Sequence, residues 1–273
     1  MFIESMIESE IATTNRHMFL YGRNTPQREK TLKTIADKYP FVIGRDEPCV
    51  IYIDNIGLPT IKEKAENIDE NKISRISMYY LEFTIMGAIL NKVKLVTDIP
   101  VEFVNSMIDI FSYFSKNKHS NIDELLQGVK LGKEFWSAFY HSYLTTGNDI
   151  EFDKKIDSLD IVFAPFMSRF IEEILEVANN KSPFQLVFNR KKEISIYSVQ
   201  SLNSLLVLRC NGSMNIKIAC ECDEWETTAD SYGNVAEFVH DYTILELDNS
   251  FQESMDKIKT ANQMNGLDQR RAI

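Results

Sequence analysis

The fold is set by a segment at residues 17–54, which reads HMFLYGRNTPQREKTLKTIADKYPFVIGRDEPCVIYID. It opens with an apolar run that ends at Gly22, which is typical of a buried strand followed by a turn. Residues 28–38 have the apolar spacing of a helix, and Tyr39-Pro40 ends that pattern. The run CVIYID at 49–54 indicates a second strand. Because both strand-like runs are continuously apolar, they predict a parallel sheet covered on both faces.

The same alternation of strands and helices returns in the last third of the chain. Strand-like runs occupy 184–188, 215–222 and 242–247, and helical patterns at 161–178, 198–209 and 250–258 alternate with them. Strands separated by helices join through right-handed crossovers into one parallel sheet. We therefore predict an α/β fold with a five-stranded, mainly parallel sheet and helices on both faces. Strand 17–21 should be central, flanked by 184–188 and 215–222 or their neighbours.

The middle of the chain is predicted to be helical. A charged connector at 62–72 precedes helical patterns at 73–94, 100–115, 121–129 and 133–144, the last two separated by Gly132. This part holds a concentration of aromatic residues, namely Phe111, Tyr113, Phe114, Phe135, Trp136, Phe139, Tyr140 and Tyr143. We interpret them as buried packing rather than a stacking platform for bases, which would need basic neighbours.

These patterns give a domain organisation. Residues 62–159 form a helical insertion, residues 1–61 and 160–262 form the α/β core, and residues 263–273 form a flexible tail. The inserted helical subdomain should pack against one end of the sheet.

Composition narrows the class of protein. The 273 residues include 40 acidic and 30 basic side chains, a formal net charge of −10, with 44% hydrophobic and 26% charged residues. These values are typical of a folded globular protein. The acidic balance argues against nucleic-acid binding and against an anionic membrane surface. The sequence has no apolar run of membrane-spanning length and no basic, apolar leader at its start, so we expect a cytoplasmic protein.

Metal-ligand spacing is not evident. The four histidines lie far apart, and Cys220 and Cys222 have no second pair of ligands nearby, so we predict no metal site made by the protein alone. Asp54 ends an apolar strand, and we interpret it as a turn residue rather than a magnesium ligand.

The loop after strand 17–21 has the layout of a phosphate-binding loop. In such a loop, backbone N–H groups surround the phosphates, a lysine neutralises them, and a hydroxyl holds magnesium. Here Gly22 and Asn24 would shape the turn, Lys30 would contact the phosphates and Thr31 the metal ion. Glu29 stands where the standard motif has glycine, so we expect its carboxylate to cap the helix and to fill the phosphate position.

The order of elements and the stretch from Phe184 to Asp248 resemble P-loop NTPases of the AAA+ class, in particular bacterial ATPases related to the ORC/Cdc6-like group. The segments that carry the resemblance are FQLVFNRKKEISIYSVQSLNSLL and NIKIACECDEWETTADSYGNVAEFVHDYTILELD. The family has Asp-Glu after its third strand, for magnesium and for the attacking water. This chain has Asn189-Arg190 there, and the family's polar sensor falls near Glu221 or Cys222.

The resemblance implies ATP with magnesium as the only cofactor, but the diagnostic acids are missing. Phosphoryl transfer depends on positioning and charge neutralisation, to which the metal contributes much. We therefore expect a P-loop NTPase-fold protein that acts as a non-hydrolysing interaction or regulatory subunit, with a protein partner or a second copy of itself. The alternative is an ATP-binding protein with slow or partner-assisted hydrolysis. A DNA-associated regulator is disfavoured by the net charge.

Overall fold

The computed structural model describes residues 2–23, 25–54, 57–66, 68–112, 115–148, 167–190, 194–207, 212–221, 227–238 and 240–248. Its strands are β1 (His17–Tyr21), β2 (Cys49–Ile53), β3 (Phe184–Asn189), β4 (Met214–Cys220) and β5 (Tyr242–Glu246). Its helices are α1 (Phe2–Thr13), α2 (Pro26–Lys38), α3 (Glu70–Lys94), α4 (Val101–Ser112), α5 (Ile122–Thr146), α7 (Met167–Val177) and α8 (Ile196–Val207).

The five strands form one sheet in the order β2-β3-β4-β1-β5, and every pairing is parallel. This confirms the predicted five-stranded parallel sheet. β1 lies inside the sheet, between β4 and β5, but the central strand is β4 and not β1 as predicted. The predicted neighbour 215–222 is therefore correct, whereas β3 lies one strand further away, beyond β4. The edges of the sheet are β2 and β5.

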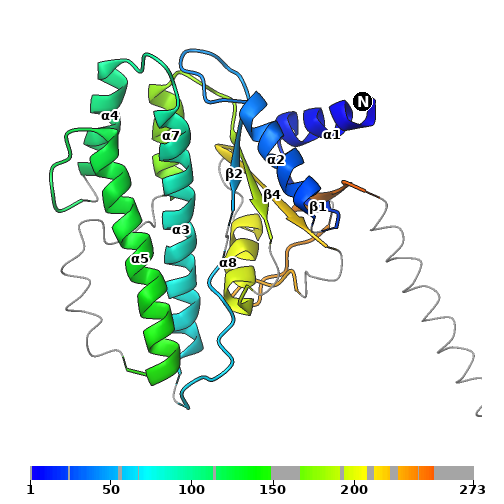
Figure 1. Ribbon diagram of the computed structural model, residues 1–273, viewed down its shortest axis with the longest axis vertical. Coiled ribbons are helices and arrows are strands. Elements are labelled where there is room, and N and C mark those ends of the chain that lie inside the picture. The colour runs from blue at the N-terminus through cyan, green and yellow to red at the C-terminus, as the bar shows by residue number, and fades with distance from the viewer. Residues whose placement is uncertain are drawn as a thin grey trace, which may run out of the picture.

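Successive side chains of each strand point to opposite faces of the sheet and belong to two hydrophobic clusters, one on each face. On one face, Ile51 and Ile53 of β2 pack with α3 and α8. On the other, Val50 packs with Leu32 and Ile35 of α2, and α1 joins the same cluster. Figure 1 shows α3 and α8 on one side of the strands and α1 and α2 on the other. The predicted cover on both faces is therefore confirmed.

The helices α3, α4, α5 and α7 stand side by side next to the sheet (Figure 1). Their buried aromatic residues belong to the same hydrophobic cluster as β2 and β3; they include Phe111, Trp136, Phe139, Tyr140 and Tyr143. The predicted burial of these five residues is confirmed, Phe135 is half-buried, and Tyr113 and Phe114 lie outside the described residues. The core thus runs without interruption from the sheet into the helices, and the boundary at 62–159 stays a prediction.

One helix prediction is wrong. The patterns at 121–129 and 133–144 form the single helix α5, and Gly132 lies within it. A Cβ atom at Gly132 would lie 2.4 Å from Cε1 of Phe83, which is fully buried on α3. The glycine therefore allows α3 and α5 to approach each other closely and does not end a helix.

Several predictions fall outside the described residues. They are the helix at 250–258, the tail at 263–273, and the start of the predicted helix at 161–178.

Candidate functional site

The predicted phosphate loop is short. β1 ends at Tyr21, and Thr25 is the N-cap of α2, with its hydroxyl accepting a hydrogen bond from the N–H of Arg28 at 3.2 Å. Pro26 follows as the first helical residue, where its missing N–H costs nothing. The expectation that Glu29 caps the helix is wrong, since Thr25 does so. Glu29 instead forms an ion pair with Lys33, one turn further along α2, at 2.5 Å.

The buried guanidinium of Arg28 joins the carboxyl-terminal ends of β1 and β3. Nη1 donates to the carbonyl of Gly22 at 2.6 Å, Nη2 to the carbonyl of Arg190 at 2.9 Å, and Nε to Oδ1 of Asn189 at 3.1 Å. Arg28 is only 6% exposed. Nδ2 of Asn189 in turn donates to the hydroxyl of Tyr52 at 3.1 Å. The chain therefore supplies its own cation at the carboxyl-terminal ends of β1 and β3, where the resemblance would place phosphates and magnesium.

The backbone N–H groups of the loop also have partners within the chain. The N–H of Gly22 donates to the carbonyl of Cys220 at 3.1 Å, and the N–H of Arg23 donates to Oδ2 of Asp248 at 2.9 Å. A Cβ atom at Gly22 would lie 2.9 Å from Cβ of Leu247. Gly22 therefore allows the segment after β5 to pass close to the loop, and the carboxylate of Asp248 lies where an anion would meet the N–H of Arg23.

The structure brings three of the four predicted site residues together. Gly22, Lys30 and Thr31 line a cavity of about 410 Å³, whose wall also includes Ile7 of α1 and Asp248. Neither Asn189 nor Arg190 lines this cavity. Lys30 is exposed and Thr31 half-buried. The fourth residue, Asn24, lies outside the described residues, so the nucleotide role of this set stays a prediction.

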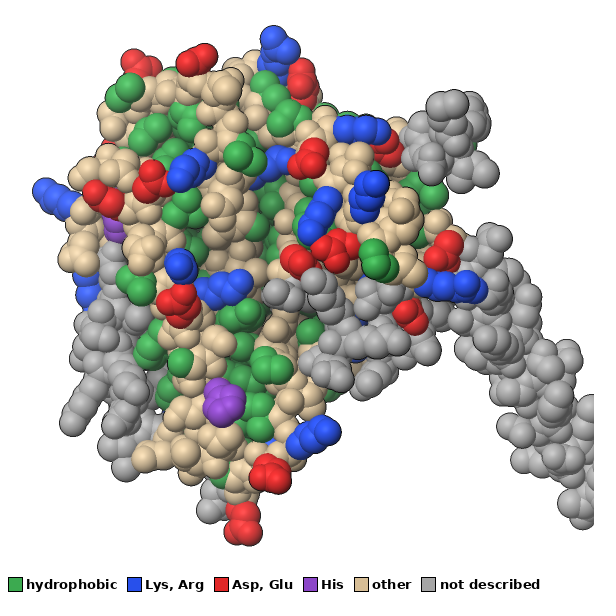
Figure 2. Space-filling model, viewed as in Figure 1, with side chains coloured by type: hydrophobic (Ala, Val, Ile, Leu, Met, Phe, Trp, Pro, Cys, Tyr) green, Lys and Arg blue, Asp and Glu red, His purple; other side chains and the backbone are tan. Residues whose placement is uncertain are grey.

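A larger hollow lies between α2 and β2 on one side and α3 and α5 on the other. Its volume is about 820 Å³, and its charged lining residues are Lys33, Asp37, Asp54, Lys92, Lys94, Asp123, Lys130 and Lys133. Figure 2 shows this face, with hydrophobic side chains between the charged ones. We call this hollow the lysine groove. Sequence reasoning missed it because its residues come from four separate elements; the pair Lys130 and Lys133, one turn apart on a helix, was the only local signal.

Within the described residues, little supports a metal site made by side chains or a reactive cysteine. There, no three His, Cys, Asp or Glu side chains gather as metal ligands would. Cys49 and Cys220 are buried and not disulfide-bonded, and burial raises the pKa of Cys49 to about 12, so it stays a thiol. Cys222 lies outside the described residues, and Glu221 is half-buried at the end of β4.

No helix among the described ranges combines the length and apolarity needed to cross a bilayer. The chain matches no protein-family model, no curated protein and no solved structure. Because a fold alone does not determine function, the function has to be argued from these sites.

Proposed function

We propose that this protein is a P-loop NTPase-like α/β protein that does not hydrolyse nucleotide and acts as an interaction or regulatory subunit. The observation that carries the proposal is the set of three hydrogen bonds made by buried Arg28. Hydrogen bonds to a charged group contribute roughly 1.5–3 kcal/mol each to stability. A ligand that displaced this guanidinium would have to replace those bonds and supply new donors to the carbonyls of Gly22 and Arg190.

The residues after β3 support the same conclusion. Magnesium prefers carboxylate and other oxygen ligands in octahedral geometry. Asn189 is neutral, its Oδ1 already accepts from Arg28, and the next residue is the buried cation Arg190. A magnesium ion at the ends of these strands would therefore meet the guanidinium of Arg28 and no carboxylate from positions 189 and 190. Activation of water by that route is not supported.

The interaction role is supported by the segment between β4 and β5. Three of its large hydrophobic side chains are exposed, Tyr232 by 82%, Val235 by 58% and Phe238 by 57%. Where exposed hydrophobic side chains form a contiguous patch, that patch marks a site at which a protein contacts a partner. The partner that this surface would contact is a protein or a second copy of this chain.

A second candidate function is ATP binding with slow or partner-assisted hydrolysis. One observation favours it: Gly22, Lys30 and Thr31 share one cavity. In this alternative, Lys30 would contact the phosphates in this cavity, whose lining also includes Arg28, and Thr31 would hold the metal ion.

The two candidates are separated by titrating magnesium-ATP into the full chain and measuring phosphate release. The variants are Lys30→Ala and, as a control, Lys181→Ala, because Lys181 is exposed and lines neither the cavity nor the lysine groove. We expect no phosphate release from any of the three proteins, and no ATP binding that Lys30→Ala weakens. ATP binding together with phosphate release, both lost in Lys30→Ala and kept in Lys181→Ala, would refute the proposal and establish the second candidate.

A further inference from the structure

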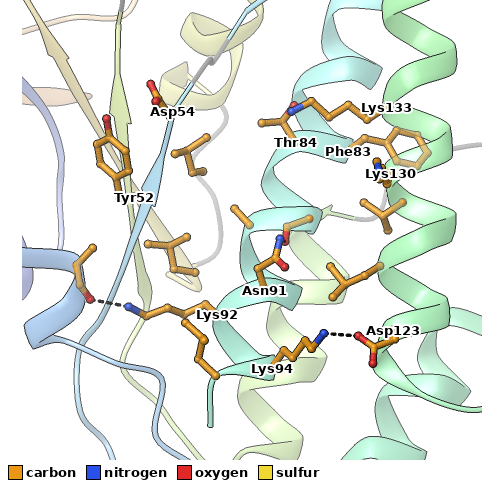
Figure 3. Close-up of a pocket in the computed structure, with 18 of the residues that line it drawn as sticks. Tyr52, Asp54, Phe83, Thr84, Asn91, Lys92, Lys94, Asp123, Lys130 and Lys133 are labelled. Carbon is orange, nitrogen blue, oxygen red and sulfur yellow. Dashed lines mark hydrogen bonds and ion pairs between the residues drawn. The ribbon is translucent and has the colours of Figure 1, made fainter. Parts of the chain in front are cut away.

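The lysine groove lies beside the edge strand β2 and plays no part in the proposed function. Residues 51–53 of β2 and Asp54, which follows the strand, line it together with α2, which covers one face of the sheet, and with α3 and α5 on the other face (Figure 3). The groove therefore wraps around the open edge of the sheet. Its volume of about 820 Å³ falls in the range of roughly 300–1,000 Å³ that is usual for small-molecule sites.

The groove is positively charged, although the chain as a whole is acidic. Its lining has five lysines and three aspartates, whereas the whole chain has a net charge of −10. Two of the lysines form close ion pairs with carboxylates, Lys33 with Glu29 at 2.5 Å and Lys94 with Asp123. Lys130 has only a loose, exposed contact with Glu134, at 3.9 Å.

Within the described residues, the other two lysines have no carboxylate partner. Nζ of Lys92 donates to the backbone carbonyl of Ala36 at 2.5 Å, and Nζ of Lys133 lies 5.2 Å from the centre of the Tyr80 ring. Across the residues with a defined position, no carboxylate oxygen lies within 4.0 Å of either ammonium group. Both side chains are half-buried, and burial lowers the pKa of each. Partly desolvated lysines of this kind gain stability when an anion comes close.

The positions of these groups define where an anion would lie. In Figure 3, Lys133 reaches from α5 towards Thr84 of α3, and Lys130 projects from the same helix, one turn away. The carboxylates Asp37 and Asp54 belong to the opposite wall, on α2 and at the end of β2, and the third lining carboxylate, Asp123 of α5, is paired with Lys94. An anionic group is therefore expected on the α5 side, at Lys130 and Lys133.

The wall formed by β2 adds apolar and backbone groups. Ile51 and Ile53 line the groove together with Phe83 of α3. The N–H of Val50 donates to the carbonyl of Tyr39 at 3.1 Å, so it points away from β3. Because alternate residues of a strand direct their backbone groups to the same side, the N–H and carbonyl of Tyr52 also point to this outer edge. A ligand in the groove could contact both an apolar surface and backbone polar groups.

We propose that the lysine groove binds a phosphorylated small molecule. Its phosphate is bound by Lys130 and Lys133, and its apolar or aromatic body lies on Ile51, Ile53 and Phe83 and extends towards Asn91 and Lys92. Lysine binds phosphate as a point charge. Two lysines one helical turn apart therefore match the two charges of a phosphate dianion better than they match the single charge of a carboxylate. The apolar wall requires that the phosphate be attached to an organic group.

The test is calorimetric titration of the full chain at low salt with four probes: AMP, phenyl phosphate, adenosine and inorganic pyrophosphate. We expect AMP or phenyl phosphate to bind saturably, adenosine not to bind, and pyrophosphate to bind at least tenfold more weakly than the better organic phosphate. Lys133→Met should weaken binding at least tenfold, and Lys181→Met, the matched control on the surface outside the groove, should leave it unchanged.

A second measurement does not depend on the variant's stability. In wild-type protein with ¹³C-labelled lysine, the Cε signal of Lys133, assigned by its loss in Lys133→Met, should shift saturably with the organic phosphate. The proposal is overturned if neither organic phosphate binds by 10 mM, or if Lys181→Met weakens binding as much as Lys133→Met. It is also overturned if pyrophosphate binds as tightly as the organic phosphates, because the apolar wall would then contribute nothing.

Discussion

Replacement of Gly132 by alanine tests the close approach of α3 and α5. The new Cβ atom would lie 2.4, 2.7 and 2.9 Å from three carbon atoms of the Phe83 ring. All three distances are shorter than real Cβ contacts allow, and Phe83 is fully buried, so the ring or a helix must move. Overpacking of a core costs about 1–3 kcal/mol. Alanine gains about 1 kcal/mol over glycine inside a helix. Since three ring atoms are involved, we take an overpacking cost of about 3 kcal/mol. After the helix-propensity gain of about 1 kcal/mol, we expect the free energy of unfolding to fall by about 2 kcal/mol.

The assay is equilibrium unfolding in urea, with the midpoint compared at an unchanged m-value. Gly87→Ala is the matched control, because Gly87 lies inside α3 and its Cβ would meet Val129 at an ordinary 3.5 Å. That variant should gain up to about 1 kcal/mol from helix propensity alone. If Gly132→Ala stabilises the protein as Gly87→Ala does, the helices are not packed through this glycine and the reasoning fails.

Two further predictions concern buried polar groups. His17 accepts the N–H of Ile216 at 2.9 Å through Nδ1, and burial, with a smaller effect of Lys217, lowers the pKa of His17 to about 4. Between pH 6.5 and 4, the unfolded chain therefore takes up a proton at this histidine that the folded protein does not. The free energy of unfolding of the wild type should fall by about 3 kcal/mol over this range because of this group. His17→Asn, which keeps an acceptor, should reduce the pH dependence of urea unfolding by that amount, and an equal dependence in both proteins would contradict the assignment. Arg28→Met should lower the free energy of unfolding by about 3 kcal/mol in the same assay, because two buried carbonyls lose their donor. Arg28→Lys should recover only part of this loss. A loss below about 0.5 kcal/mol in Arg28→Met would show that the guanidinium does not hold the strand ends together.

The fold was predictable because its signals are local. A continuous apolar run such as CVIYID can be buried on both faces only in the interior of an α/β protein, and helices between such runs force parallel pairing. Gly132 was misinterpreted for a physical reason: a glycine that ends a helix and one that allows another helix to approach look the same in sequence. The difference lies in Phe83, which is 49 positions earlier in the chain.

The candidate sites were less predictable because their partners are distant in sequence. The motif spacing drew attention to Lys30, whereas the structure places Arg28, two residues earlier, at the ends of β1 and β3. Arg28 contacts Asn189 and Arg190, which lie 161 and 162 residues further along the chain. The lysine groove likewise depends on how α3 and α5 pack, which brings Lys92 and Lys133 to one hollow. Residue type and spacing along one helix cannot reveal such pairs.

The departures from the P-loop pattern are physically coupled. An aspartate at position 189 would bond Arg28 as a buried ion pair, which is costly to desolvate. Asn189 is neutral. Its Oδ1 accepts a hydrogen bond from Nε of Arg28, and its Nδ2 donates one to the hydroxyl of Tyr52. On the other side of the loop, the carboxylate of Asp248 accepts a hydrogen bond from the N–H of Arg23. If the proposed P-loop resemblance holds, Arg28 and Asp248 carry the charges that a metal ion and a phosphate would carry in an NTPase. In the P-loop-like fold that we propose, the residues that depart from the motif therefore form hydrogen bonds with one another at the carboxyl-terminal ends of β1 and β3.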